Sequence, residues 1–222
     1  MKFLGKEIKL AIFDLDGTLI DSTCLWGDID KEFFNRRGME VPQDYGRNIA
    51  HLGLKAAAKY TKDNYFPNEN VKDMMDEWTQ LSMEAYAHNI PLKEGAKETL
   101  DYFYKNNVPL ALATANSQEL YLPCLKRLGI DKYFSFIIDV TTCKEGKSSP
   151  EIYDRASDHF NVKREETVIF EDMILPMKTA FKAGYNVVGV YDYHSIKDKK
   201  DECIKYTHLF LDSYKDLFKL IK

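Results

Sequence analysis

Residues 11–22 read AIFDLDGTLIDS, a hydrophobic run that ends in two aspartates, Asp14 and Asp16, and continues through Gly17 and Thr18. The apolar residues before Asp14 predict a buried strand. Two like charges at the end of such a strand are unfavourable unless something neutralises them. The alternative is a strand-terminal turn held by Asx-type hydrogen bonds, and the rest of the chain distinguishes the two interpretations.

Further short runs rich in β-branched or aromatic residues follow the first. With residues 9–14 they make six predicted strands, the others being 108–114, 134–139, 167–172, 186–192 and 207–212. Runs that are apolar on both faces are typical of parallel strands covered by helices on both sides. Helical spacing fills the intervals, at 93–107, 117–130 (which contains Pro123), 149–162 and 174–184. We therefore predict an α/β fold with a Rossmann-like, doubly wound, mostly parallel sheet.

Between residues 21 and 91 the apolar spacing is helical, at 26–38, 48–65 and 71–89, and no strand pattern appears. Pro91 and Gly95 mark the return to the α/β pattern. We therefore predict a core domain made of residues 1–20 and 92–222, with a helical domain inserted at 21–91. The aromatic residues of the insert are expected to pack between its helices.

The bulk composition excludes several classes of function. The formal net charge of −4, from 31 basic and 35 acidic residues in 222, does not favour a nucleic-acid partner. The four cysteines are scattered without a CxxC pair, which favours reduced thiols in the cytoplasm. Because no segment approaches the ~18 apolar residues of a membrane span, we expect no membrane partner. A monomer is favoured over an oligomer.

Reactive residues follow several of the predicted strands. In doubly wound sheets the carboxyl ends of the strands meet at one edge, so Asp14, Thr114, Glu171 and Asp172 should converge. Two carboxylates about 4 Å apart repel by roughly 4 kcal/mol at an effective dielectric near 20. The acidic residues therefore imply a divalent cation, and oxygen ligands favour Mg²⁺. The predicted metal ligands are Asp14, Asp172, Glu171 and Asp16.

A metal beside a lysine and a hydroxyl suits a phosphoryl group. Lys147, which alone would be an ordinary surface lysine, can offset the charge of the phosphate, while Thr114, Ala115 and Asn116 bind it. Asn116 has the N-cap of a helix as an alternative role. Asp14 can attack phosphorus, and Asp16 can protonate the leaving oxygen and then accept a proton from water.

This constellation resembles the haloacid dehalogenase-like superfamily of hydrolases, subfamily IA, whose members include β-phosphoglucomutases and phosphoglycolate phosphatases. The motifs that carry the resemblance are Asp14-Leu15-Asp16-Gly17-Thr18, then Thr114, then Lys147 with Pro150, and finally Glu171-Asp172. The resemblance implies a Mg²⁺-dependent phosphatase that acts on a small phosphorylated metabolite, a sugar phosphate or nucleotide, through an aspartyl-phosphate. It also implies that the helical insert is a cap that closes over the core.

The sequence departs from the family pattern at several positions. Ser148 replaces the proline that follows the lysine in many relatives, and Met173 and Pro176 stand where a serine and a glycine are common. These changes retain the catalytic charges and affect the shape of the loops and the transfer of specificity from a relative. Lys55, in Gly53-Leu54-Lys55, resembles a substrate-contacting residue of the cap, with a solvated surface lysine as the alternative.

Three other functions compete with the phosphatase. A phosphosugar mutase is less favoured because Trp26 stands where β-phosphoglucomutases carry a histidine. A non-catalytic protein that binds phosphorylated ligands would need the same phosphate contacts without turnover. A phosphorylated receiver module shares an acidic cluster, a threonine and a lysine around Mg²⁺, but the helical insert argues against it.

Overall fold

The structure is a computed structural model that describes residues 1–22, 24–49, 52, 54–197 and 199–220. The chain divides into two compact units. The α/β unit contains Met1–Thr23 and Ile90–Lys222, and the helical unit contains Cys24–Asn89. The chain therefore leaves the α/β unit after its first long strand and returns to it about seventy residues later.

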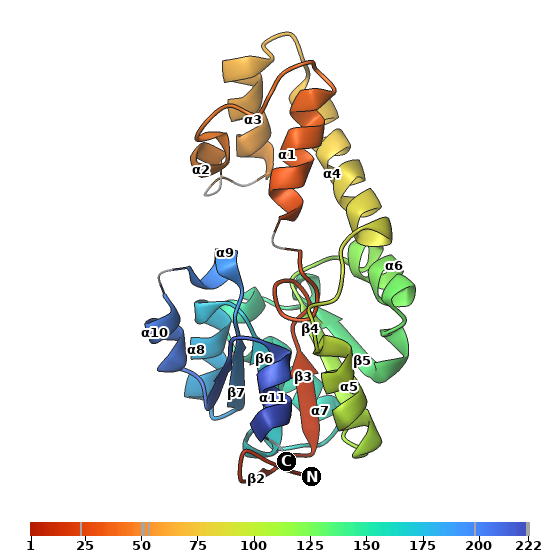
Figure 1. The fold of residues 1–222 in the computed structure, drawn as a ribbon, viewed down its shortest axis with the longest axis vertical. Coiled ribbons are helices and arrows are strands. Elements are labelled where there is room, and N and C mark those ends of the chain that lie inside the picture. The colour runs from red at the N-terminus through yellow and green to blue at the C-terminus, as the bar shows by residue number, and fades with distance from the viewer. Residues whose placement is uncertain (23, 50–51, 53, 198, 221–222) are drawn as a thin grey trace. The chain divides into compact units, whose positions relative to one another are not determined.

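A six-stranded parallel sheet forms the centre of the α/β unit, in the order β5-β4-β3-β6-β7-β8 (Figure 1). Its strands are β3 (Leu10–Phe13), β4 (Leu110–Thr114), β5 (Phe134–Asp139), β6 (Thr167–Glu171), β7 (Asn186–Val190) and β8 (Leu209–Leu211). The first strand of this sheet along the chain, β3, is central because β4 pairs with one of its edges and β6 with the other. This arrangement confirms the predicted doubly wound sheet.

Helices cover both faces of the sheet (Figure 1). They are α5 (Ala96–Lys105), α6 (Gln118–Leu128), α7 (Glu151–His159), α8 (Ile174–Ala183), α9 (Tyr193–Ile196), α10 (Lys200–Ile204) and α11 (Tyr214–Leu220). The 3-10 turns are η1 (Asp131–Tyr133), η2 (Val140–Thr142), η3 (Gly146–Ser148) and η4 (Arg164–Glu166). A two-stranded hairpin of β1 (Lys2–Phe3) and β2 (Lys6–Glu7) precedes the sheet and was not predicted.

Alternation along the strands gives the two faces different cores. Leu10 and Ile12 belong to a cluster with Ile152 of α7 and Met177 of α8. Phe13 belongs to an aromatic group on β1, α5, α11 and the neighbouring strand β6, and it stacks on Phe170 with the ring centroids 4.3 Å apart. The other members of that group are Phe3, Phe103 and Tyr214. Because both faces are buried, the strands read as continuous apolar runs.

The helical unit consists of α1 (Leu25–Asn35), α2 (Tyr45–Ile49), α3 (Leu54–Tyr65) and α4 (Val71–His88). Aromatic rings fill its interior, as predicted, with Phe33, Phe34 and Trp78 buried. The Arg37 guanidinium lies 3.6 Å from the centre of the Phe33 ring and donates two hydrogen bonds of 2.7 Å to Glu69. Its charge is thereby neutralised where it borders the apolar interior.

The sequence predicted which helices and strands are present more accurately than it predicted the residues at which they begin and end. All six predicted strands are present, and most are a few residues shorter than their apolar runs. The helix predicted through Pro123 forms as α6. Residues 48–65, predicted as one helical run, contain the end of α2 and all of α3.

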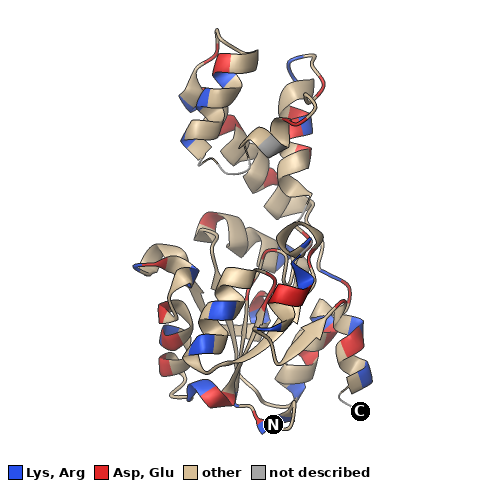
Figure 2. Ribbon diagram, turned by 90° about the vertical axis from the view of Figure 1, so that its left-hand side faces the viewer, with Lys and Arg blue, Asp and Glu red and all other residues tan. Residues whose placement is uncertain are grey.

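The charged residues are mixed in sign. On the face in Figure 2, Lys and Arg residues are interspersed with Asp and Glu along the helices.

None of the helices in the described residues is long and apolar enough to cross a membrane.

Candidate active site

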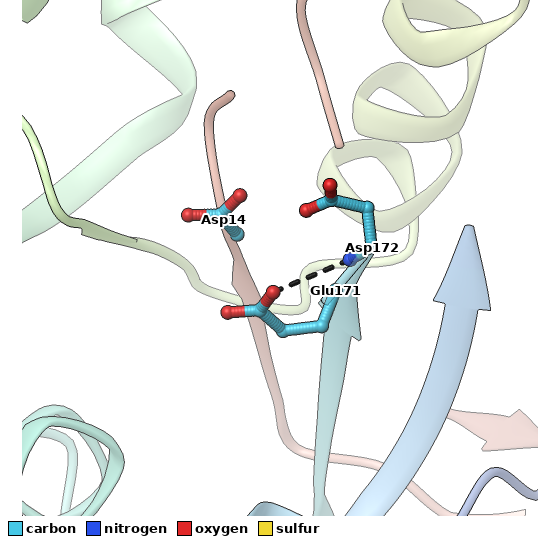
Figure 3. A group of neighbouring side chains, drawn as sticks. All are labelled: Asp14, Glu171 and Asp172. Carbon is cyan, nitrogen blue, oxygen red and sulfur yellow. Dashed lines mark hydrogen bonds between the residues drawn. The ribbon is translucent and has the colours of Figure 1, made fainter. Parts of the chain in front are cut away.

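The ends of β3 and β6 bring three carboxylates together (Figure 3). Phe13 pairs with Phe170 in the parallel register, and the N–H of Asp14 donates to the carbonyl of Phe170 at 3.0 Å. Asp14, at the end of β3, therefore lies at the same edge of the sheet as Glu171 and Asp172, at the end of β6. One ligand oxygen from each of Asp14, Glu171 and Asp172 lies within 4.8 Å of the others.

These three carboxylates are buried, with exposed fractions of 6% for Asp14, 1% for Glu171 and 2% for Asp172. Burial raises the pKa of Asp172 well above its usual range, and the charges of Asp14 and Glu171 raise it further. Burial likewise raises the pKa of Glu171 to about 7, against the opposing effect of the Lys147 charge. Ionisation of all three carboxylates is therefore unfavourable without a cation, and their oxygens are donors that hard divalent cations take.

Lys147 is the cation of this cluster. It lies on η3, and its Nζ donates to Asp14 Oδ1 and to Glu171 Oε1 at 2.5 Å. Burial alone would lower the pKa of Lys147, but the charges of Asp14 and Glu171 outweigh burial and raise it. The lysine is therefore protonated and bridges the ends of two neighbouring strands. Helix α7 begins at Glu151, directly after Pro150, and so lies close behind this turn, within the predicted helical range 149–162.

Gly17 and Thr18 complete the surroundings of Asp172. Gly17 has φ +71°, and a Cβ at this position would lie 2.3 Å from Asp172 Oδ2. A side chain at position 17 would therefore both strain the backbone and collide with a candidate metal ligand. Thr18 Oγ1 donates to Asp172 Oδ1 at 3.1 Å.

Asp16 lies outside the three-carboxylate group. Its carboxylate accepts a hydrogen bond from the side-chain amide of Asn116, whose backbone N–H donates to Thr114 Oγ1 at 3.1 Å. The ends of β3 and β4 are joined in this way. The N-cap position of the helix after β4 belongs to Ser117 and not to Asn116, so the alternative N-cap role for Asn116 is wrong. The roles of Asp16 as metal ligand and proton donor stay predictions.

The remaining candidates lie at two other places. Ala115 is exposed in the loop after β4, whereas Thr114 is fully buried at its end. Lys55 is exposed on α3 of the helical unit, and Gly53 of the same motif lies outside the described residues. Their contacts with a substrate stay predictions.

Two residues in contact with the cluster were not predicted. Tyr153 of α7 donates from its hydroxyl to Glu171 Oε1 at 3.0 Å, and Ser195 of α9 donates to Asp172 Oδ2. Tyr153 occupies a core position of an amphipathic helix and carries no sequence signal of function. Ser195 lies beyond the predicted strand 186–192, on a short helix that the sequence did not predict, so its position gave no signal of a contact with Asp172.

Known proteins share this sequence pattern and this fold. The family model described as haloacid dehalogenase-like hydrolase matches residues 11–190. The chain therefore belongs to the haloacid dehalogenase-like hydrolases, as the four motifs predicted.

Two curated relatives and one solved structure illustrate the similarity. A phosphorylated carbohydrates phosphatase of Thermotoga maritima is 26% identical over 87% of this chain and 89% of its own. A phosphoglycolate phosphatase of Nitrosococcus oceani is 26% identical over 88% and 90%. A crystal structure titled "putative beta-phosphoglucomutase", also from Thermotoga maritima, has a TM-score of 0.86 with 23% identity, covering 96% of this chain and 98% of that one. The family match and the two curated phosphatases support the predicted enzyme class, a phosphoric monoester hydrolase.

Proposed function

We propose that this protein is a Mg²⁺-dependent phosphatase that hydrolyses a small phosphorylated metabolite through an aspartyl-phosphate on Asp14. The observation that carries the proposal is the buried cluster in which Lys147 pairs with Asp14 and Glu171 while Asp172 stands beside them. The names of the two curated phosphatases support a substrate such as a sugar phosphate.

In this proposal Asp14 and Asp172 would hold the metal, with Glu171 beside them, whereas Asp16, which lies outside the three-carboxylate group, would serve as the proton donor. The metal, when bound, supplies positive charge that offsets the charge of the phosphoryl group. Lys147 adds a second positive charge at the same place and pairs with the Asp14 carboxylate. Thr114, Ala115 and Asn116, at the end of β4, would bind the phosphate oxygens.

The chemistry then divides between two aspartates. A carboxylate oxygen of Asp14 attacks phosphorus, and the bond between phosphorus and the leaving oxygen breaks as Asp16 gives that oxygen a proton. Asp16, now ionised, takes a proton from water, and the resulting hydroxide attacks phosphorus. The bond from phosphorus to Asp14 breaks, so inorganic phosphate leaves and both aspartates return to their first states.

Asn116 contacts Asp16 and can influence how that residue accepts a proton from water. Its amide donates to the Asp16 carboxylate, which orients that group toward the end of β4, where Thr114 lies. A donor on the ionised form stabilises it, so Asn116 would favour the step in which Asp16 has lost its proton.

The helical unit would act as the cap, and Lys55 on it would contact the leaving group. The predicted insert, 21–91, corresponds to a compact unit of the structure with nearby limits, Cys24–Asn89. Closure of such a unit would exclude water while the phosphoryl group is transferred. All four cysteines are free thiols, which supports the cytoplasm as the proposed location.

A panel of phosphorylated sugars, nucleotides and phosphoglycolate tests this proposal, with inorganic phosphate as the readout. We expect release that requires Mg²⁺ and stops when a chelator removes it. The Asp14→Asn variant serves as the blank. Absence of Mg²⁺-dependent release across the panel, together with ligand binding, would favour a non-catalytic binding protein.

The mutase alternative is tested with a sugar 1-phosphate and a bisphosphate primer. A phosphatase releases inorganic phosphate from both compounds. Formation of the sugar 6-phosphate without net release would show a mutase instead.

A further inference from the structure

Asp172 has a hydroxyl donor on each of its two carboxylate oxygens. Thr18 donates to Oδ1 at 3.1 Å, and Ser195 donates to Oδ2 at 2.5 Å. Each oxygen of a carboxylate has two lone pairs, so each one retains a lone pair for a metal ion. The two hydroxyls therefore fix the plane of the carboxylate and leave its capacity for metal binding intact.

The backbone at Ser195 is itself anchored. Ser195 lies on α9, a single turn that follows β7, and Asp192 begins this turn. Asp192 Oδ1 accepts hydrogen bonds from the backbone N–H groups of His194 at 3.1 Å and of Ser195 at 3.2 Å. The hydroxyl that contacts Asp172 is thus presented by a turn whose conformation depends on one carboxylate.

The other oxygen of Asp192 is bound by Lys93. Lys93 Nζ lies 2.9 Å from Asp192 Oδ2 and donates to the carbonyl of Tyr191 at 2.8 Å. Both side chains are largely buried, with exposed fractions of 15% for Lys93 and 4% for Asp192. Solvent and salt screen such a pair less than they screen a surface pair.

Lys93 lies on the segment by which the chain re-enters the α/β unit. Its backbone N–H donates to the carbonyl of Leu19 at 2.9 Å, and Leu92 bridges Ile20 on the outgoing segment. The outgoing segment also contains Thr18, the other hydroxyl donor to Asp172. The outgoing connection therefore contacts Asp172 Oδ1 through Thr18. The returning connection is linked to Asp172 Oδ2 through Lys93, Asp192 and Ser195.

We propose that Ser195 is a positioning residue that orients Asp172 for metal binding, and that the Lys93–Asp192 ion pair holds Ser195 in place. The inference rests on the proposed function, because it assigns Ser195 a role only if Asp172 binds a metal. Hydrogen-bond partners of metal-ligating carboxylates orient their ligands, and their removal typically weakens metal affinity about 10-fold to 100-fold.

The test compares Mg²⁺ binding by the purified full chain and its variants, measured by calorimetry without substrate. We expect Ser195→Ala to bind Mg²⁺ about 10-fold more weakly than the unmodified protein. Ser195→Thr retains the hydroxyl, so its affinity should return to within about threefold of the unmodified value. Ser135→Ala is the matched control, since Ser135 is an exposed serine at the opposite end of a strand.

Thermal unfolding separates positioning from a merely structural role. Bound Mg²⁺ raises the melting temperature of a protein that it binds, and the increase depends on affinity. If Ser195 positions Asp172, Ser195→Ala should reduce the increase that Mg²⁺ produces. A structural role would instead lower the melting temperature equally with and without Mg²⁺, which would overturn the proposal.

The ion pair is tested with Lys93→Met, which keeps an unbranched side chain of similar length. We expect Mg²⁺ affinity to fall in the same direction as in Ser195→Ala, by about threefold, because α9 remains tethered by its backbone. Unchanged affinity in Lys93→Met would overturn the part assigned to the ion pair.

Failure of this inference is distinguishable from failure of the proposed function. An unmodified protein that binds Mg²⁺ and releases phosphate, with a Ser195→Ala variant of equal affinity, would overturn the positioning role alone. An unmodified protein that neither binds a divalent metal nor releases phosphate would overturn the proposed function and this inference with it.

Discussion

Both units contain buried acidic groups, but the surroundings of these groups differ. In the α/β unit the buried carboxylates gather at the ends of β3 and β6, where Lys147, Tyr153 and two hydroxyls contact them. In the helical unit Asp30 of α1 is also buried, with an exposed fraction of 8%, and burial raises its pKa to about 6. Burial raises the pKa of acidic groups in both units. A lysine and hydroxyl donors contact those of the α/β unit, whereas burial alone accounts for the raised pKa of Asp30.

The comparison shows why the candidate catalytic residues gather at the edge of the sheet, whereas most residues of the helical insert serve its packing. Parallel strands end at a common edge, so polar residues from distant parts of the chain meet there regardless of the details of packing. The helical unit is organised around rings such as Phe33 and Trp78, and its polar residues are mostly on its surface. Substitutions in the two units should therefore differ in kind: loss of chemistry in one and change of stability in the other.

The largest expected effect is that of Asp14→Asn in the acidic cluster. The amide cannot act as the nucleophile, so we expect turnover of a generic phosphate ester with Mg²⁺ to fall by at least ~10³-fold. Folding should be retained, because the substitution removes a buried charge and preserves the shape. Turnover near the unmodified rate would show that Asp14 is not the nucleophile.

Asp16→Asn should produce the next largest effect. Loss of the proton donor should lower turnover by about 10²-fold to 10⁴-fold, most strongly for substrates with poor leaving groups. Because Asp16 lies outside the three-carboxylate group, Mg²⁺ affinity measured by calorimetry should change little. A large loss of Mg²⁺ affinity in this variant would mean that Asp16 acts chiefly as a metal ligand.

Two glycines with matched backbones sharpen the comparison between the units. Gly17 has φ +71° and would place a Cβ against Asp172, whereas Gly38 in the helical unit has φ +69° and nothing within 4 Å. Gly17→Ala should lower the free energy of unfolding by about 2–4 kcal/mol through backbone strain and the collision, and should weaken Mg²⁺ binding.

Gly38→Ala should lower the free energy of unfolding by about 1–2 kcal/mol, from backbone strain alone, and leave turnover unchanged. Denaturant unfolding and turnover of both variants check these values. Equal losses of stability and activity in the two would show that the close approach to Asp172 has no consequence.

The smallest expected effect concerns Asp30. Its pKa is raised in the folded protein, so stability from this group is fully present below about pH 4 and is lost as pH rises through about 6. Asp30→Asn should therefore raise the free energy of unfolding at pH 7.5 by about 1–2 kcal/mol, allowing for solvent screening, and have little effect at pH 4. Denaturant unfolding at both pH values checks this, and an equal gain at both would contradict it.

The sequence predicted the site where backbone geometry alone determines it. Asp14 and Asp172 follow strand ends, and the parallel register brings them together whatever their side chains contact. The two-residue period of a strand would place Asp16 on the same side as Asp14. The structure ends β3 at Phe13 and turns at Gly17, so the side chain of Asp16 contacts Asn116 instead of joining the acidic group.

Other contacts depended on tertiary packing that no local pattern encodes. Tyr153 occupies a core position of α7, and only the packing of that helix on the sheet brings its hydroxyl to Glu171. Ser195 depends on a four-residue turn that the predicted elements did not include. The hairpin of β1 and β2 escaped prediction because two-residue strands are shorter than any hydrophobic period can identify.

The central position of β3 in the sheet also has a consequence for how the chain folds. Lys147 lies 133 residues after Asp14, and Asp172 lies 154 residues after Thr18. Pairings of this separation are slow to form because long loops must close first. During synthesis the helical unit, whose contacts lie within Cys24–Asn89, can fold while β3 still has neither of its neighbours. The acidic cluster would then assemble late, after β6 has emerged, and a truncated chain that ends before β6 would expose an unpaired edge of β3 to other chains.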